Sequence, residues 1–242
     1  MNSLRDLPEK LADCQNKGTT CGEIFFCEGD SAGGNAKMER NPDQAVFPLR
    51  GKILNTFTKD LGEIVKNEEV KNILTILGCG IYDNFNIKNL RYDKIIFMAD
   101  ADPDGGHITC LLTALFLRHL PQLIEAGKIY TAVPPLYRVH TTKGDVYCYS
   151  DAELKAVKGK GEITRFKGLG EMNPRELYDT TMNPETRKLV QLTTADLNEA
   201  LELYDTLMGS SPKARREFIL AHKLGKVGDE EDIYDDDEGD DE

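Results

Sequence analysis

Short apolar runs that stop abruptly at acidic, glycine or proline residues dominate the hydrophobic pattern of this chain. Residues 24–27, 94–99 and 128–133 are runs of this kind. Apolar runs of about four to eight residues with such ends are typical of strands buried on both faces, as in parallel sheets. The pattern therefore predicts three buried strands whose carboxyl ends meet at one edge of a sheet.

Helical patterns separate these strands. In residues 68–77 apolar side chains recur at helical spacing, and Gly78 is a typical helix end. Residues 107–120 are apolar on nearly every side, which indicates a helix buried against a sheet. This alternation predicts a doubly wound α/β domain that extends to about residue 135. The other segments of this part are expected to be a short helical piece at 7–14, a helix at 32–39 and a loop at 47–55.

The pattern changes after residue 135. Residues 136–140 and 146–150 flank a Lys-Gly-Asp turn and predict a β-hairpin. We expect Asp151 to cap a short helix that extends to residue 157, and Asn173 followed by Pro174 to begin another. Further helices are expected at 194–208 and 211–222, and the expected core residues of this part are Met182, Leu189, Val190 and Leu192.

The chain thus divides into five expected parts. They are a lead-in linker at 1–20, an α/β domain at 21–135, a hairpin-containing insertion at 136–165, a helical region at 166–225 and a disordered acidic tail at 226–242. The net charge is −12, and residues 229–242 carry eleven acidic residues and no basic one, so the rest of the chain stands at −1. The acidic charge therefore does not argue against a nucleic-acid partner for the folded part.

Other features of the composition favour a cytoplasmic protein. No apolar stretch approaches the roughly 18 residues of a membrane span, and the first residues lack the apolar segment of a secretion signal. The six cysteines show no Cys-x-x-Cys spacing, so we expect reduced thiols rather than a zinc site.

Four carboxylates follow two of the predicted strands. Glu28 comes directly after the first, and Asp100, Asp102 and Asp104 alternate after the second. Two like charges at about 4 Å repel by about 4 kcal/mol at an effective dielectric of about 20, so such a group favours a bound cation. Mg²⁺ is the expected ion because it prefers oxygen ligands and keeps water for a phosphate substrate.

Three other motifs bear on this interpretation. The Asp100 run opens like a calcium-binding EF-hand loop, but its twelfth position is Leu111 and a strand precedes it. Residues 29–33 match the Gly-x-Ser-x-Gly elbow of serine hydrolases, with Ser31 as nucleophile and Asp100 with His140 as conceivable partners. No phosphate-binding P-loop motif is present.

Basic residues lie in two glycine-containing loops. Arg50 and Lys52 flank Gly51, and Arg165 and Lys167 precede Gly168. Contact with a phosphate backbone and ordinary solvated charge are both compatible with these positions.

Several ordered motifs together are specific to one family. They are Glu28-Gly29-Asp30-Ser31-Ala32-Gly33-Gly34, Pro48-Leu49-Arg50-Gly51-Lys52, Asp100-x-Asp102-x-Asp104-Gly105-x-His107 and Lys167-Gly168-Leu169-Gly170-Glu171-Met172-Asn173. From about residue 7 to residue 218 the chain resembles the TOPRIM domain and carboxyl-terminal region of bacterial type IIA DNA topoisomerase B subunits. Both the gyrase and the topoisomerase IV branches fit, and residues 112–116 and 165–167 lean toward topoisomerase IV.

The resemblance implies a fold and roles for particular residues. The fold would be α/β, a TOPRIM Rossmann-like parallel sheet flanked by helices, with a small α+β insertion and tail region. Residues 21–135 would be the TOPRIM domain and 166–225 the gyrase-B-like helical region. Glu28, Asp100 and Asp102 would be catalytic, and with Asp104 they would bind Mg²⁺, for which Mn²⁺ or Ca²⁺ could substitute. The implied DNA contacts are Arg50, Lys52, His107 and Lys167.

The resemblance also implies partners. Transient double-strand DNA cleavage and religation would use a tyrosine of an A-type subunit in an A2B2-type assembly, near the nucleoid. The ATPase and transducer region would lie on the same full-length protein or on a separate chain, so this chain would be an excised domain or a split-gene product, inactive alone. The alternative is a stand-alone TOPRIM nuclease or primase-like enzyme.

Overall fold

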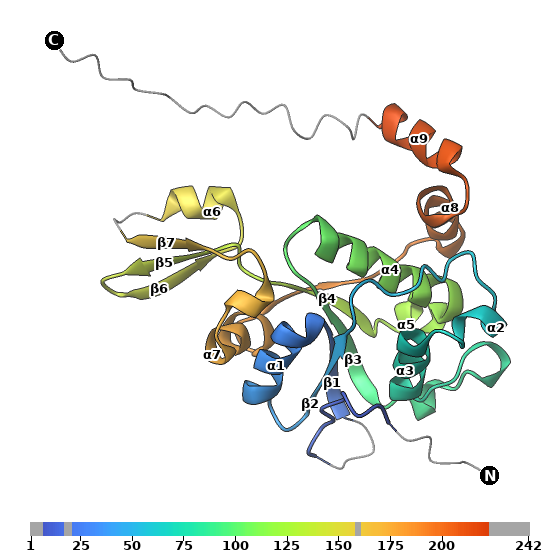
Figure 1. Cartoon of the computed structure of the whole chain (residues 1–242), viewed down its shortest axis with the longest axis horizontal. Coiled ribbons are helices and arrows are strands. Elements are labelled where there is room, and N and C mark those ends of the chain that lie inside the picture. Colours follow the sequence, from blue (N-terminus) through green and yellow to red (C-terminus); the bar gives the residue numbers. More distant parts are fainter. Residues whose placement is uncertain (1–6, 17–20, 158–160, 223–242) are drawn as a thin grey trace.

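A five-stranded sheet forms the centre of the fold (Figure 1). The computed structural model describes residues 7–16, 21–157 and 161–222, so the expected acidic tail lies outside the described residues. The strand order is β2-β1-β3-β4-β8. The strands are β1 (Cys21–Glu28), β2 (Gln44–Leu49), β3 (Tyr92–Met98), β4 (Ile129–Val133) and β8 (Lys188–Gln191). The first four are parallel and β8 is antiparallel to β4, which confirms a mostly parallel α/β fold.

Helices cover both faces of this sheet (Figure 1). One face carries α1 (Gly29–Glu39), α7 (Pro174–Leu177), a 3₁₀ turn η3 (Leu169–Glu171) and a π-helical turn η4 (Tyr178–Met182). The other carries α3 (Glu68–Leu77), α4 (Pro103–His119) and α5 (Pro121–Glu125). Shorter elements on that side are α2 (Leu61–Ile64), η1 (Tyr82–Asn84) and η2 (Ile87–Asn89).

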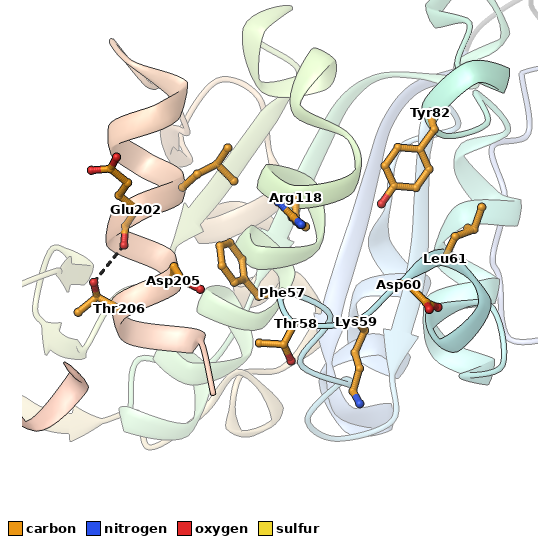
Figure 2. A pocket seen from close by; sticks show the side chains of 11 residues that line it. Phe57, Thr58, Lys59, Asp60, Leu61, Tyr82, Arg118, Glu202, Asp205 and Thr206 are labelled. Atoms are coloured by element: carbon orange, nitrogen blue, oxygen red, sulfur yellow. Dashed lines mark hydrogen bonds between the residues drawn. The ribbon is translucent and has the colours of Figure 1, made fainter. Parts of the chain in front are cut away.

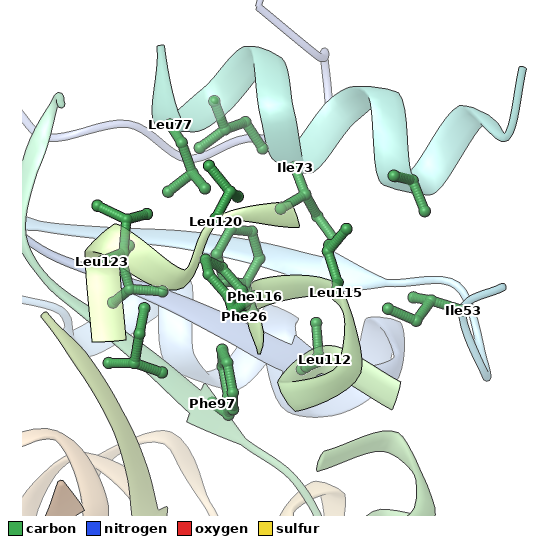
Figure 3. Packing of buried hydrophobic residues seen from close by; sticks show 14 of the residues in the cluster. Phe26, Ile53, Ile73, Leu77, Phe97, Leu112, Leu115, Phe116, Leu120 and Leu123 are labelled. Carbon is green, nitrogen blue, oxygen red and sulfur yellow. The ribbon is translucent and has the colours of Figure 1, made fainter. Parts of the chain in front are cut away.

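Alternate residues of the central strands enter two separate cores. Phe26 and Phe97 point to the side of α4, where Phe97 and Phe116 rings lie 5.4 Å apart (Figure 3). Phe25 and Met98 point to the other side, toward α1 and η3. Because successive side chains of a strand point to opposite faces, continuous apolar runs produce a sheet that is buried on both sides.

A second, three-stranded sheet projects from the first (Figure 1). Its order is β6-β5-β7, with β5 (Tyr137–Thr141), β6 (Gly144–Cys148) and β7 (Glu162–Arg165), and α6 (Asp151–Ala156) lies beside it. The predicted hairpin is confirmed, and β7 is an additional strand. The buried Glu176 of α7 accepts hydrogen bonds from Arg138 and Tyr147, both at 3.1 Å, and so fastens this sheet to the main body.

Two helices end the described part of the chain. The predicted helices at 194–208 and 211–222 are α8 (Leu197–Met208) and α9 (Pro212–Ala221). One side of α8 packs against α4 and the core cluster to which α4 belongs, through Leu197, Leu201, Tyr204 and Met208. No helix among the described residues is long and apolar enough to cross a membrane.

Several local expectations are wrong. Residues 7–14 form no helix, because Ala12 pairs with Val46 in an isolated bridge. The expected loop at 47–55 begins inside β2, an edge strand. Pro48 is tolerated there because its nitrogen faces the same outer side as the Val46 N–H, beyond the isolated bridge to Ala12, so no bond to β1 is lost. The cap of α6 is Ser150 rather than Asp151.

Two expectations about side chains also need correction. Val190 is 59% exposed rather than core, since β8 is an edge strand with one open face. Free thiols are found at Cys27, Cys79, Cys110 and Cys148, but Cys14 is disulfide-bonded, so the expectation of reduced thiols fails there.

A buried ion pair fastens the carboxyl-terminal region to the start of β1. Arg187, whose side chain is 4% exposed, donates from Nη1 to Glu23 Oε2 at 2.6 Å and also bonds Oε1 through Nη2. Gln44 donates to the same carboxylate at 3.0 Å, and Lys94 lies 3.4 Å away. Burial alone would raise the pKa of Glu23, but the bonds from Arg187 and Gln44 and the nearby positive charges bring it below its usual value.

We expect Arg187→Leu to lower the free energy of unfolding by about 3 kcal/mol at neutral pH, since it leaves a buried carboxylate without its main partner. A lowered pKa stabilises the fold above the usual carboxyl range, and this contribution is lost as pH falls through the folded-state value. The difference between variant and wild type should therefore shrink in acid, as urea unfolding at about pH 7 and about pH 4 would measure. Arg175→Leu, at the exposed Arg175–Asp179 pair, is the control and should change stability by less than about 0.5 kcal/mol. A difference that stays constant between the two pH values would contradict this account of the ion pair.

Candidate metal and nucleic-acid site

Glu28 and Asp100 lie together at the carboxyl ends of two adjacent strands. Cys27 of β1 is in register with Met98 of β3, so the residues that follow each strand emerge side by side. The backbone N–H of Asp100 donates a hydrogen bond to Glu28 Oε2 at 3.0 Å. The structure therefore brings this predicted pair into direct contact.

Asp102 and Asp104 occupy the beginning of α4. Asp102 is the N-cap, and its Oδ1 accepts from the Gly105 N–H at 2.7 Å, with Pro103 at the first helical position. Gly105 passes so close to the preceding turn that a Cβ there would lie 2.1 Å from the Asp100 carbonyl oxygen. The helix start therefore folds back over Asp100, which explains why a glycine is required in the first turn of α4.

Charge repulsion and burial act on this group together. Burial raises the pKa of Glu28, as do the negative charges of Asp100, Asp102 and Asp104, against the lowering effect of the Asp100 N–H bond. Burial also raises the pKa of Asp100, against a hydrogen bond from the Leu169 N–H. Raised carboxyl pKa values beside like charges are typical of sites that hold a cation or handle a proton.

Asp104 differs from the other three acids. Its Oδ1 lies 2.7 Å from Lys52 Nζ, and this hydrogen bond holds the pKa of Asp104 below its usual value. Asp104 is thus paired with Lys52 in this structure, and its place beside Glu28, Asp100 and Asp102 as a metal ligand stays a prediction. Among the described residues, no three His, Cys, Asp or Glu side chains are grouped to hold a metal ion.

The donors present nevertheless fit Mg²⁺. This ion is usually held by one or two carboxylates and completes its octahedron with water and phosphate oxygens. The Glu28 carboxylate bonds the Asp100 backbone, and the carboxylates of Asp100 and Asp102 both lie near enough for their charges to raise the pKa of Glu28. The donor set thus suits an ion shared with a phosphate substrate.

The predicted basic residues surround the same edge of the sheet. Arg50 follows β2 directly, Lys52 reaches Asp104, and His107 lies in the second turn of α4. Lys167 precedes η3, and all four residues are exposed. Exposed basic residues near two half-buried carboxylates, Glu28 and Asp100, are suited to a polyanion whose phosphates approach the acids.

One member of the site was missed by sequence reasoning. The backbone N–H of Leu169 donates to Asp100 Oδ1 at 2.7 Å, from a segment 69 residues away in sequence. The glycines at 168 and 170 were the signal available, because glycine often marks a close approach of backbone to another group.

The serine-hydrolase alternative lacks its triad. Ser31 lies exposed in the first turn of α1, but His140 pairs with Asp145 in the hairpin, with Nδ1 2.6 Å from Oδ1. Asp100, the proposed acid, is bonded to the Leu169 N–H instead. The two conceivable partners of Ser31 are therefore bonded to other residues.

A surface cleft lies away from the carboxylates, between the segment after residue 56 and α8 (Figure 2). Arg118 lies beside the Phe57 ring, 6.0 Å from its centre, and Glu202 and Asp205 belong to the α8 wall. None of the predicted site residues lines this cleft.

Comparison with known families divides the chain into two matched segments. Residues 23–133 match the Toprim domain family, and residues 158–220 match the family described as DNA gyrase B subunit, carboxyl terminus. The first segment contains all four acids, and the second contains the turn that bonds Asp100.

Similar proteins share about half of their residues with this chain. The DNA gyrase B subunit of Thermotoga maritima is 50% identical over 224 residues, which is 90% of this chain and 35% of that protein. The protein of the same name from Archaeoglobus fulgidus is 48% identical over 223 residues, again 90% and 35%. The mitochondrial DNA gyrase B subunit of Arabidopsis thaliana is 49% identical over 221 residues, 88% of this chain and 30% of that protein. The chain thus spans about a third of the length of these curated relatives.

We expect Glu28→Gln to raise the melting temperature at about pH 7 in the presence of EDTA. The change removes one charge from a repelling group, and the amide oxygen can still accept the Asp100 N–H bond. Thermal unfolding followed by circular dichroism measures the effect. Asp30→Asn, at a side chain that is 73% exposed two residues along, is the matched control and should change stability by less than about 0.5 kcal/mol. A lower melting temperature for Glu28→Gln would show that the carboxylate stabilises the fold instead.

Proposed function

Because residues 23–133 belong to the Toprim family and residues 158–220 to the family of DNA gyrase B carboxyl termini, we propose that this chain is the cleavage-supporting part of a type IIA DNA topoisomerase. In this role it supports transient double-strand cleavage and religation by a tyrosine of a partner A-type subunit. The observation that carries the proposal is the contact of Glu28 with Asp100 at the strand ends, beside exposed cations.

The reaction is a reversible transesterification. The partner tyrosine gives up its hydroxyl proton as its oxygen bonds to a DNA phosphorus, the bond from phosphorus to the 3′ oxygen breaks, and that oxygen takes up a proton. Religation runs the same steps backwards. Glu28 is suited to exchange this proton because burial and neighbouring acids raise its pKa. Mg²⁺, held by Glu28 and Asp100 with Asp102 nearby, would neutralise negative charge on the phosphate.

The basic residues hold the DNA backbone rather than read its sequence. Arg50, Lys52, His107 and Lys167 are exposed, so they can reach phosphates without loss of folded structure. Contacts to phosphate fix the position of a duplex and carry no base information. Binding should therefore tolerate many sequences and weaken as salt rises.

The similarity to DNA gyrase B subunits supports a proposal about the assembly. We propose an A2B2-type complex in the cytoplasm, with the DNA, in which an ATPase and transducer region acts with this chain. Mn²⁺ or Ca²⁺ can take the place of Mg²⁺, since both accept the same oxygen donors.

Asp102→Asn should reduce DNA cleavage by about 100-fold or more while the fold survives. Asparagine caps a helix about as well as aspartate, so the bond from Gly105 is kept while the negative charge is lost. Electrostatic stabilisation of a phosphate by a metal site is worth several kcal/mol, which sets the size of the effect. Cleavage would be measured with an A-type subunit, the ATPase region, ATP and Mg²⁺ supplied.

Asp102→Ala is the companion variant. It should lose cleavage equally and also about 1 kcal/mol of stability, since it removes the cap. Full cleavage by Asp102→Asn would exclude Asp102 from the site. Mg²⁺-dependent nicking or primer synthesis by the chain alone would favour the stand-alone nuclease or primase-like alternative.

Removal of single cations should change how DNA binding depends on salt. The plot of log affinity against log salt concentration has a negative slope. For Arg50→Ala and for Lys167→Ala we expect the magnitude of this slope to decrease by about 0.9, the value for one phosphate contact. Fluorescence anisotropy with two unrelated duplexes measures the slope, whose magnitude should decrease equally for both. Lys213→Ala, at an exposed lysine of α9, is the control and should leave the slope unchanged. An unchanged slope for Arg50→Ala and Lys167→Ala would contradict the phosphate contacts and indicate that both residues are ordinary solvated charges.

A further inference from the structure

We propose that the turn at residues 167–171 of the carboxyl-terminal region positions Asp100, so that the metal affinity of the Toprim edge depends on Gly168 and on the Leu169 amide. The inference rests on the proposed function, in which the Asp100 carboxylate holds Mg²⁺, because it states that the turn orients this carboxylate. It assigns these two residues a positioning role, since they act through Asp100.

The contact is direct and leaves no room. Leu169 N–H donates to Asp100 Oδ1 at 2.7 Å. A Cβ added to Gly168 would lie 2.5 Å from Asp100 Oδ2 and 2.9 Å from its Cγ, and the three nearest atoms all belong to that one carboxylate. Asp100 Oδ1 is thus fixed by a hydrogen bond from the turn, and Oδ2 occupies a position that a side chain at residue 168 would obstruct.

The backbone of Gly168 gives no other reason for a glycine. Its φ is −162° and its ψ is 166°, an extended conformation that any residue adopts. The absence of a side chain is therefore needed for the close approach to Asp100. A substitution by alanine tests this steric contact without straining the backbone.

The turn is itself firmly anchored. Leu169 and Met172 are each 1% exposed and pack in the core that contains Phe25 and Met98. Glu171 Oε2 accepts from the Lys167 N–H at 2.8 Å, and Asn35 of α1 donates to the Met172 carbonyl at 2.8 Å. The turn is thus a rigid support, and Asp100 adapts to it rather than the reverse.

Asp100 is held on two sides as a result. Its own N–H is bonded to Glu28, and its side chain is bonded to Leu169. Groups that orient a metal-binding side chain typically change metal affinity by about 10- to 100-fold when they are altered. The carboxyl-terminal region therefore contributes to the metal site although it supplies no acid to it.

The experiment is a double-mutant cycle in the whole chain with Gly168→Ala and Asp100→Ala. Mg²⁺ affinity is measured from the rise in melting temperature with Mg²⁺ concentration, and the free energy of unfolding is measured by urea in EDTA. We expect Gly168→Ala to weaken Mg²⁺ binding by about 10-fold or more and to lower stability. In the Asp100→Ala background the methyl group meets no carboxylate, so the same change should have no further effect on either quantity. Gly34→Ala, at a helical glycine with open space around it, is the control and should leave Mg²⁺ affinity unchanged.

Two results would overturn the inference. One is an unchanged Mg²⁺ affinity in Gly168→Ala. The other is an equal loss of stability from Gly168→Ala in both backgrounds, which would mean that the methyl group acts elsewhere. If Asp100→Ala itself leaves Mg²⁺ binding intact, the proposed function fails, and the coupling measured in EDTA still reports whether the turn holds Asp100.

Discussion

The hydrogen bond from the Asp100 N–H to Glu28 joins the ends of β1 and β3, and the proposed chemistry of the site depends on it. The parallel register of these two strands sets the two residues side by side before any ligand is present. That arrangement places like charges together, which disfavours the folded state. The surrounding structure compensates through two cores, one on each face of the sheet. Candidate functional groups that destabilise the fold locally are commonly supported by a well-packed core, as these acids are.

The sequence predicts the elements that have strong periodicity or clear ends. The helix at 68–77 is predicted to the residue from its apolar spacing and from Gly78, which ends it in a left-handed conformation with φ of 73°. The structure adds Asn67 as its N-cap. The apolar runs before Glu28 and Asp100 identify β1 and β3, since a fully buried strand tolerates little else. Local chemistry is sufficient in these places.

Other elements depend on tertiary contacts that the sequence does not display. The sequence favours a loop at β2 because Pro48 disfavours a central strand, and only its place at the sheet edge makes the proline acceptable. β8 has four residues and pairs antiparallel to β4, so neither its length nor its pattern identifies it. The same limit applies to the site: the acids follow from motif spacing, whereas the Asp104–Lys52 pair and the Leu169 contact join distant segments.

The position of β8 has a consequence for how this molecule loses structure. Residues 188–191 belong to the segment that matches the gyrase B carboxyl-terminal family, yet they extend the sheet of the Toprim segment, and α8 packs on α4. Detachment of that segment would strip an edge strand from the sheet and uncover apolar side chains of the α4 side. We therefore expect the segments that match the two families to unfold together rather than as independent units. Local opening is therefore expected in peripheral parts such as the sheet of β5, β6 and β7, and separation of the two family segments is expected to accompany global unfolding.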